Sequence, residues 1–178
     1  PLINGTDKVE NTGALKTFEE MDMGWGTMMY TTDLPEIPVQ SLLTADFHDY
    51  AQVFINNKLI GKVDREKNEK SVTLPAVKKG DKLSIIVEAM GRINFGRAIK
   101  DFKGIVSDVV ITTETDGIET TWKPRLWTKT TIPDDYATAQ KAFGLKKLSD
   151  SSKTPGYYRG YFTLKRVGDT FLNFETWG

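Results

Sequence analysis

The sequence predicts an all-β protein that opens with a β-sandwich or a β-barrel. Short runs rich in β-branched and aromatic residues recur about every ten residues, and turn-forming residues separate them. No segment from residue 18 to residue 113 has the periodicity of a long helix. These two observations define the fold class, and the elements follow in chain order.

Residues 1–17 are predicted to form a linker, because they combine turn formers and charges with little periodicity. At its end, Thr17 and Glu20 have the spacing of a capping box, which predicts the start of a short helix. The run 24–34 is rich in threonine and aromatic residues and predicts a strand. Pro35 ends that strand.

The clearest hairpin comes next. Residues 52–55 and 59–63 are short β-branched runs joined by Asn56, Asn57 and Lys58. Asparagine tolerates the positive φ of tight turns better than other residues with a side chain. The charged run 64–70 that follows predicts a solvated loop.

Three further strands complete the first domain, which is predicted to span residues 18–114. Residues 71–77 and 82–89 form two of them, joined by a turn at 78–81 that contains a glycine. The third strand is predicted at 104–113.

The loop before this last strand carries the first candidate site. Gly91 and Gly96 bracket it, which predicts a sharply shaped connection. Three side chains inside the loop could contact a partner or a sugar. They are the guanidinium group of Arg92, the amide of Asn94 and the aromatic ring of Phe95. Alternatively, the loop is a corner packed on its own domain, with Phe95 in the core and Arg92 paired to a carboxylate.

Residues 115–178 are predicted to form a connecting segment and the truncated start of a second β-sandwich. Residues 134–148 favour one short helix, since acidic residues come early and lysines late. The spacing of residues 24–31 recurs in 156–163, and that of 42–48 recurs in 171–177. No counterpart of the later strands follows, so we expect an unpaired edge. Residues after about 150 should then be poorly ordered, dock onto the first domain or pair with a neighbouring molecule.

Composition excludes several function classes. Lys plus Arg and Asp plus Glu both number 24, so no net field favours nucleic acid or an anionic membrane. Apolar runs are far shorter than the roughly 20 residues of a spanning helix. Without cysteine and with His48 as the only histidine, we expect no metal site, cofactor or catalytic triad. The N-terminus has no features of a signal peptide, and the compartment stays open.

Aromatic side chains provide a second set of candidates. The apolar face of a sugar ring can stack on an aromatic ring, although burial in the core is the commoner role of such side chains. The candidates for stacking are Trp25, Trp122, Trp127, Tyr157 and Tyr158.

Several blocks in consistent order resemble the non-catalytic β-domains of family 35 glycoside hydrolases, the β-galactosidases. The blocks are residues 17–34, 48–65, 83–111 (which contains GRINFG and DFKG), 156–164 and 169–178. The resemblance implies β-sandwiches of the galactose-binding-like, jelly-roll type that follow a catalytic TIM barrel. In this family the pattern commonly has tyrosine at the position of Phe95.

The resemblance also implies that the chain has no catalytic residue of its own. Retaining glycosidases use two carboxylates about 5 Å apart, and in this family both lie on the barrel. Glu19, Glu20, Asp134 and Asp135 are instead typical of helix starts. The chain should therefore be inactive alone, and a bacterial parent enzyme would be periplasmic or secreted.

Two functions remain open at this stage. The chain is either an accessory region that packs on the catalytic barrel and shapes the rim of its active site, or an independent carbohydrate-binding module for galactosides. The expected partners are the barrel domain and galactosides, with no nucleic acid and no membrane.

Overall fold

The computed structural model describes residues 11–97, 99–133, 137, 161–169, 171 and 173. The chain divides into two compact units, Pro1–Leu145 and Lys146–Gly178. The strands described all belong to the first unit. They are β1 (Asn11–Gly13), β2 (Gly26–Asp33), β3 (Ser41–Thr44), β4 (Phe47–His48), β5 (Tyr50–Ile55), β6 (Lys58–Asp64), β7 (Ser71–Leu74), β8 (Lys82–Ala89), β9 (Gly104–Ile105), β10 (Val110–Thr115), β11 (Ile118–Trp122) and β12 (Trp127–Ile132).

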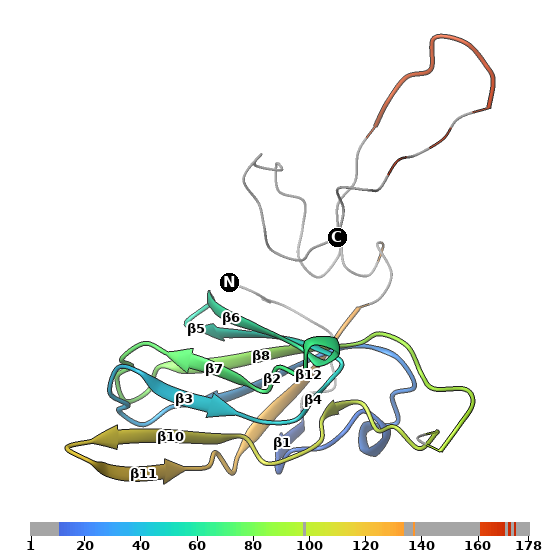
Figure 1. The fold of residues 1–178 in the computed structure, drawn as a ribbon. Coiled ribbons are helices and arrows are strands. Elements are labelled where there is room, and N and C mark those ends of the chain that lie inside the picture. Colours follow the sequence, from blue (N-terminus) through green and yellow to red (C-terminus); the bar gives the residue numbers. More distant parts are fainter. Residues whose placement is uncertain are drawn as a thin grey trace. The chain divides into compact units, whose positions relative to one another are not determined.

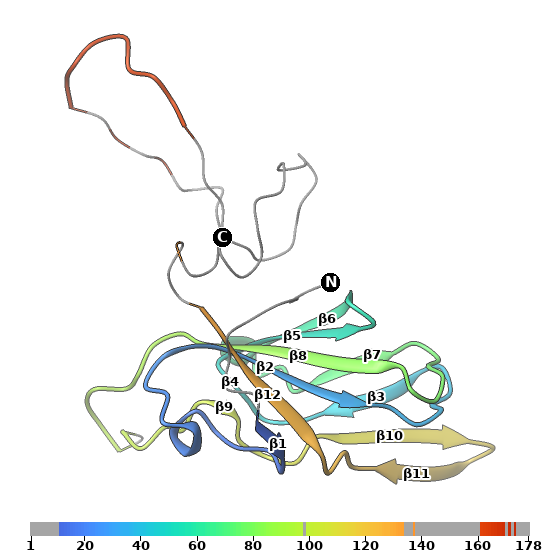
Figure 2. The same cartoon turned by 180° about the vertical axis from the view of Figure 1, so that it is seen from behind.

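The first unit is a β-sandwich, as the sequence predicted. One antiparallel sheet has six strands in the order β1-β12-β2-β8-β5-β6, and the other has four in the order β11-β10-β3-β7. Figures 1 and 2 show the two sheets stacked face to face. The short strands β4 and β9 form a separate pair. Among the described residues, no helix has the length and apolar character needed to cross a membrane.

Alternation along the strands builds the core between the sheets. Every second residue of a strand faces the same side, so a strand with one solvated face buries alternate positions. Met28 and Tyr30 on β2 are fully buried in this way, and Leu43 on β3 and Ile111 on β10 face them from the other sheet. Each fully buried large apolar side chain contributes about 1.5–3 kcal/mol.

The predictions that depend on local chemistry are confirmed. Thr17 N–H donates to Glu20 Oε2 at 2.8 Å, and Glu20 N–H donates to Thr17 Oγ1 at 3.3 Å, so the capping box forms. It opens a single 3₁₀ turn, η1 (Glu19–Met21). Asn56 and Asn57 have φ of 48° and 68° in the β5–β6 turn. Gly80 has φ of 90° in the turn before β8.

At two places the strands are arranged differently from the simple succession that the sequence suggests. The turn at Gly80 does not make a hairpin, because β7 lies at the edge of the four-stranded sheet while β8 lies between β2 and β5. The turn is therefore a crossover between sheets. The single strand expected at 104–113 is two strands, since β9 pairs with β4 and β10 pairs with β3.

The first unit extends beyond the boundary that the sequence predicted at residue 114. Strand β11 pairs with β10, and β12 lies between β1 and β2. Trp127 at the start of β12 is fully buried, so the sandwich core needs residues after 114. Strand β1 likewise lies within the predicted linker.

Most of the predicted second domain lies outside the described residues. This applies to the helix expected at 134–148, apart from Ala137, and to residues 156–160 of the repeated segment. Residues 161–164 are described and belong to no strand.

Candidate functional site

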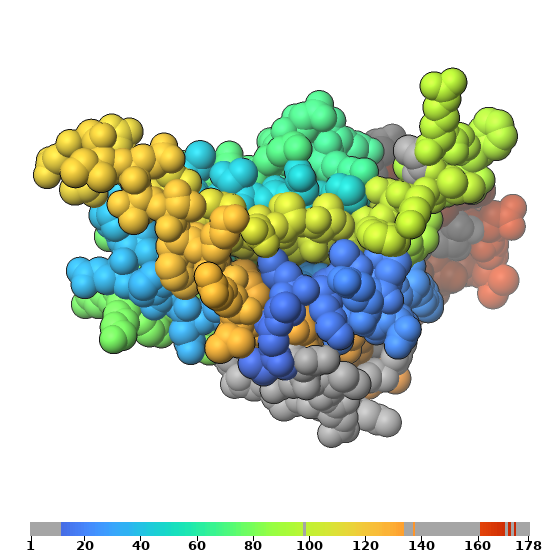
Figure 3. Space-filling view, turned by 90° about the horizontal axis from the view of Figure 1, so that it is seen from below, coloured from blue at the N-terminus to red at the C-terminus, as the bar shows by residue number. Residues whose placement is uncertain are grey.

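The loop at residues 90–103, between β8 and β9, projects from the sandwich (Figures 1 and 3). It exposes large apolar side chains that a folded domain usually covers: Phe95 is 90% exposed and Met90 66%. Trp25, just before β2, is 72% exposed. We use the name loop surface for the set Trp25, Met90, Ile93, Phe95, Ile99 and Phe102.

Arg92 ties this loop to the segment before β2. Its Nε donates to the Gly24 carbonyl at 2.6 Å, and its Nη1 lies 2.6 Å from Glu19 Oε1. Burial acts to raise the pKa of Glu19, but hydrogen bonds from the backbone N–H of Lys103, from its own N–H and from Arg92 outweigh it and hold the pKa below its usual value. The arginine is thus paired to a carboxylate, as in the corner alternative, whereas Phe95 is not in the core.

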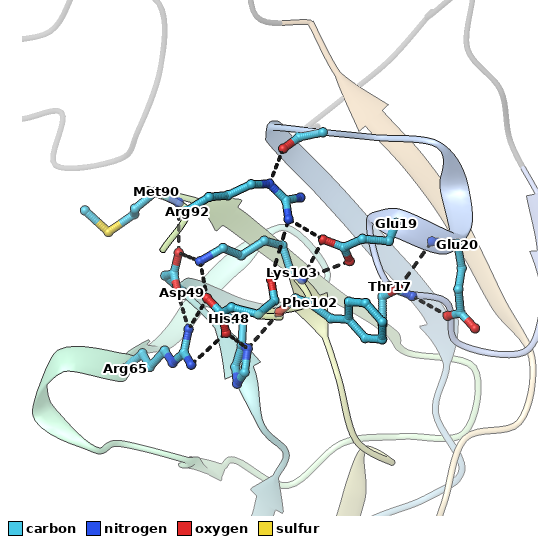
Figure 4. A network of polar contacts seen from close by, with 12 residues as sticks. Thr17, Glu19, Glu20, His48, Asp49, Arg65, Met90, Arg92, Phe102 and Lys103 are labelled. Atoms are coloured by element: carbon cyan, nitrogen blue, oxygen red, sulfur yellow. Dashed lines mark hydrogen bonds and ion pairs between the residues drawn. The ribbon is translucent and has the colours of Figure 1, made fainter. Parts of the chain in front are cut away.

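The base of the loop is held by four charged side chains (Figure 4). Lys103 is 2% exposed, and its Nζ lies 2.6 Å from Asp49 Oδ2 and 2.8 Å from Asp101 Oδ2. Arg65 binds Asp101 through both terminal nitrogens, at 3.0 and 2.9 Å, and binds Asp49 Oδ1 at 2.8 Å. We call these residues, Asp49, Arg65, Asp101 and Lys103, the charge cluster.

The two acids of the charge cluster are held in the ionised form. Hydrogen bonds from Arg65 are the main reason that the pKa of Asp101 lies well below its usual value, and Lys103 adds to them against the cost of burial. For Asp49, burial acts to raise the pKa, but bonds from Lys103 and Arg65 outweigh it and lower it. The pKa of Arg65 is raised in turn by the same contacts.

His48 supports the cluster from β4. Its Nδ1 lies 2.8 Å from the Phe102 carbonyl and 3.2 Å from Asp101 Oδ1. Across the described parts of the chain, no three His, Cys, Asp or Glu side chains are grouped to hold a metal ion. Since the two carboxylates share the two cations, the four charges balance, and the cluster holds the base of the loop with both acids ionised at neutral pH.

The aromatic candidates lie in different environments. Trp122 is partly buried against the core, and Trp127 is completely buried, with its Nε1 donating to the Pro124 carbonyl at 3.2 Å. A buried ring has no free face for a sugar, so Trp127 serves the core. Asn94 is exposed. Tyr157 and Tyr158 lie outside the described residues.

An open groove of about 750 Å³ lies next to Trp122. Thr32 and Asp33, at the end of β2, form one side. The end of β11 and the connection to β12 form the other side, through residues 121–126.

Sequence reasoning missed the charge cluster and the polar side chains of the groove. Arg65 was assigned to a solvated loop, and Asp49, Asp101 and Lys103 were not singled out. The DFKG run at 101–104 could have indicated the cluster, because it places an acidic and a basic residue two positions apart. In that block, attention went to the glycines instead.

Comparison with known proteins gives a consistent result. A family model described as "Beta-galactosidase, first all-beta domain" matches residues 16–124. Bovine β-galactosidase is 31% identical over 186 residues, which cover 90% of this chain. β-Galactosidase 1 of Dictyostelium discoideum is 27% identical over 99% of the chain, and β-galactosidase 8 of rice 29% over 90%. The chain spans 26%, 28% and 29% of these three relatives, respectively.

Proposed function

The chain belongs to the family of first all-beta domains of β-galactosidases, and from this premise we propose that it acts as the accessory β-region of a family 35 enzyme that hydrolyses terminal β-galactosides. In this role it packs on the catalytic TIM barrel and shapes the rim of the active site. The fold would then be of the galactose-binding-like, jelly-roll type.

The loop surface is the observation that carries this proposal. Soluble monomers rarely expose large contiguous apolar patches, and such patches usually mark interaction sites. Six large apolar side chains are exposed together: five belong to the projecting loop, and the sixth is the adjacent Trp25. Relatives are more than three times as long as this chain, which leaves ample length for a catalytic domain to cover the patch.

The way the loop is held also supports a docking role. Arg92 fastens the start of the loop to Gly24 and Glu19, and the charge cluster fastens its base. A surface that is ordered before binding loses less conformational entropy on association. The loop is therefore held at both ends, close to the exposed side chain of Phe95.

The acids of the charge cluster do not suit glycoside hydrolysis. A retaining glycosidase needs one carboxyl group with a raised pKa to protonate the leaving group. Asp49 and Asp101 both have lowered pKa values, because each is bound to Lys103 and Arg65. This supports placing catalysis in another domain.

The test uses the full-length enzyme that carries this region. Replacing Phe95 and Trp25 together by alanine should lower the melting temperature of the enzyme by several degrees and reduce kcat/KM, because the interface loses two anchors. Ile118→Ala, at an exposed apolar residue on β11, is the matched control and should change neither quantity. Unchanged kinetics and melting temperature in the double variant would overturn the proposal.

The isolated chain offers two checks. The same double variant should unfold at the same denaturant concentration as the parent chain, because both side chains are exposed here. The isolated chain should also leave a chromogenic galactoside intact, and hydrolysis above the blank would contradict a non-catalytic role.

A further inference from the structure

The groove beside Trp122 lies away from the loop surface, at the opposite end of β2. Trp25 precedes the first residue of β2, whereas Thr32 and Asp33 are its last two residues. We propose that this groove binds a saccharide. One sugar ring stacks against Trp122, and its hydroxyl groups form hydrogen bonds with Asp33 and Arg125. The proposal goes beyond the accessory role and does not depend on it.

The size and rigidity of the groove suit a small ligand. Its volume of about 750 Å³ falls within the range typical of small-molecule sites. Its far wall is the crossover from one sheet to the other, which is held by the buried Pro124 and by the bond from Trp127 Nε1 to the Pro124 carbonyl. This wall of the groove is therefore in place before any ligand enters.

The apolar part of the groove provides a stacking platform. Trp122 packs partly against the core, which fixes the plane of its ring, while the rest of the side chain stays accessible. Leu126 is 68% exposed beside it. An aromatic ring combines a large apolar face with a low entropy cost on binding, which suits the C–H face of a pyranose.

The polar part offers donors and acceptors at the same place. Arg125 is exposed and makes no ion pair within the described part of the chain, so its five N–H donors are available. The Asp33 carboxylate is oriented by Lys82 Nζ, 3.0 Å from Oδ1, and its second oxygen can accept. Adjacent hydroxyl groups of a sugar both donate and accept, which matches this pair.

The charge balance argues for a polyhydroxylated ligand over a polyanion. Lys123 is paired with Asp108 at 2.8 Å, and Asp33 is paired with Lys82. Among the charged residues that line the groove, only Arg125 has no partner of opposite charge within the described residues. Binding to a nucleic acid backbone requires several positive side chains. A saccharide needs one such donor and no extended positive field.

The experiment is an NMR titration of the full 178-residue chain with galactose and with lactose. We expect saturable shifts of the Trp122 indole N–H and of the backbone amides of Lys123, Arg125 and Leu126. Arg125→Gln should weaken the apparent affinity about tenfold, since hydrogen bonds from a charged group are the strong ones. Arg97→Gln is the matched control and should leave the affinity unchanged, because Arg97 is also exposed and makes no ion pair within the described residues.

The variants keep the test decisive. Trp122→Ala should abolish the shifts, and Arg125→Gln repeats the test without touching the core, because Arg125 is exposed. Absence of shifts with both sugars, shifts confined to Trp25 and residues 90–97, or equal affinity in Arg125→Gln would overturn the proposal. Absence of shifts, or equal affinity in Arg125→Gln, leaves the packing of the loop surface against a catalytic domain unaffected, because that packing rests on other residues.

Discussion

Asp49 Oδ2 accepts hydrogen bonds from the Lys103 ammonium group at 2.6 Å and from the Met90 backbone N–H at 3.1 Å. These two donors stand at the two ends of the loop 90–103. A single carboxylate oxygen therefore closes the base of the loop, and the other oxygen binds Arg65. The predictions below test this arrangement and its surroundings.

Lys103→Met should lower the free energy of unfolding by about 3 kcal/mol, because it leaves Asp49 and Asp101 with only Arg65 to balance two largely buried charges. Urea unfolding of the isolated chain measures the change. Lys82→Met is the matched control: its ion pair with Asp33 is exposed, so the loss should stay below about 1 kcal/mol. Equal losses in the two variants would contradict a special role for Lys103.

Stability should decrease as the pH falls below roughly 5. Asp49 and Asp101 have lower pKa values in the folded chain than in the unfolded chain, so the unfolded state takes up protons first on acidification. Their contribution is complete above the unfolded value and is lost as the pH falls toward the folded value. Denaturant unfolding between pH 7 and pH 3 measures this slope.

The variant Asp101→Asn isolates that effect. It should flatten the dependence of the unfolding free energy on pH, because one of the two carboxyl groups of the charge cluster with a lowered pKa is gone. Asp108→Asn, which removes an exposed partner of Lys123, should keep the slope of the parent chain. A parallel slope in Asp101→Asn would show that the acid sensitivity arises elsewhere.

Gly104→Ala should destabilise the sandwich by more than about 2 kcal/mol. Gly104 has φ of 95°, and a Cβ there would overlap the Tyr30 hydroxyl and lie 2.7 Å from the Phe18 ring. Gly80→Ala is the control, since Gly80 has φ of 90° but open space around it and should lose only about 1 kcal/mol. Thermal unfolding of both variants measures the losses of stability. Gly104→Ala combines steric overlap with backbone strain, whereas Gly80→Ala has backbone strain alone, so equal losses would argue against the overlap.

Arg92→Ala should loosen the loop without unfolding the domain. The loss of the bonds to Gly24 and Glu19 should speed amide hydrogen exchange at residues 91–97 about fivefold, which corresponds to ~1 kcal/mol of local stability. Arg97→Ala is the control, because Arg97 makes no ion pair within the described residues. Exchange that matches the parent chain would mean that the charge cluster alone holds the loop.

Features governed by neighbouring residues could be predicted from the sequence. The capping box of Thr17 and Glu20 and the turn at Asn56 and Asn57 both formed, since each depends on contacts within a few residues. Pattern alone also indicated the all-β class, and the quoted blocks pointed to the non-catalytic β-domains of β-galactosidases. Strand pairing was harder, because a turn such as that at Gly80 serves a hairpin and a crossover equally well.

The amino-acid sequence by itself therefore determined the fold class, the turns and the family of this protein. Only the tertiary structure decided that β12 completes the six-stranded sheet, that Arg65 joins Asp49, Asp101 and Lys103, and that Phe95 is exposed while Trp127 is buried. The physical reason is the range of the interactions. Local preferences act through adjacent backbone groups, whereas Asp49 and Lys103 lie 54 residues apart and meet only when strands from distant parts of the chain pair.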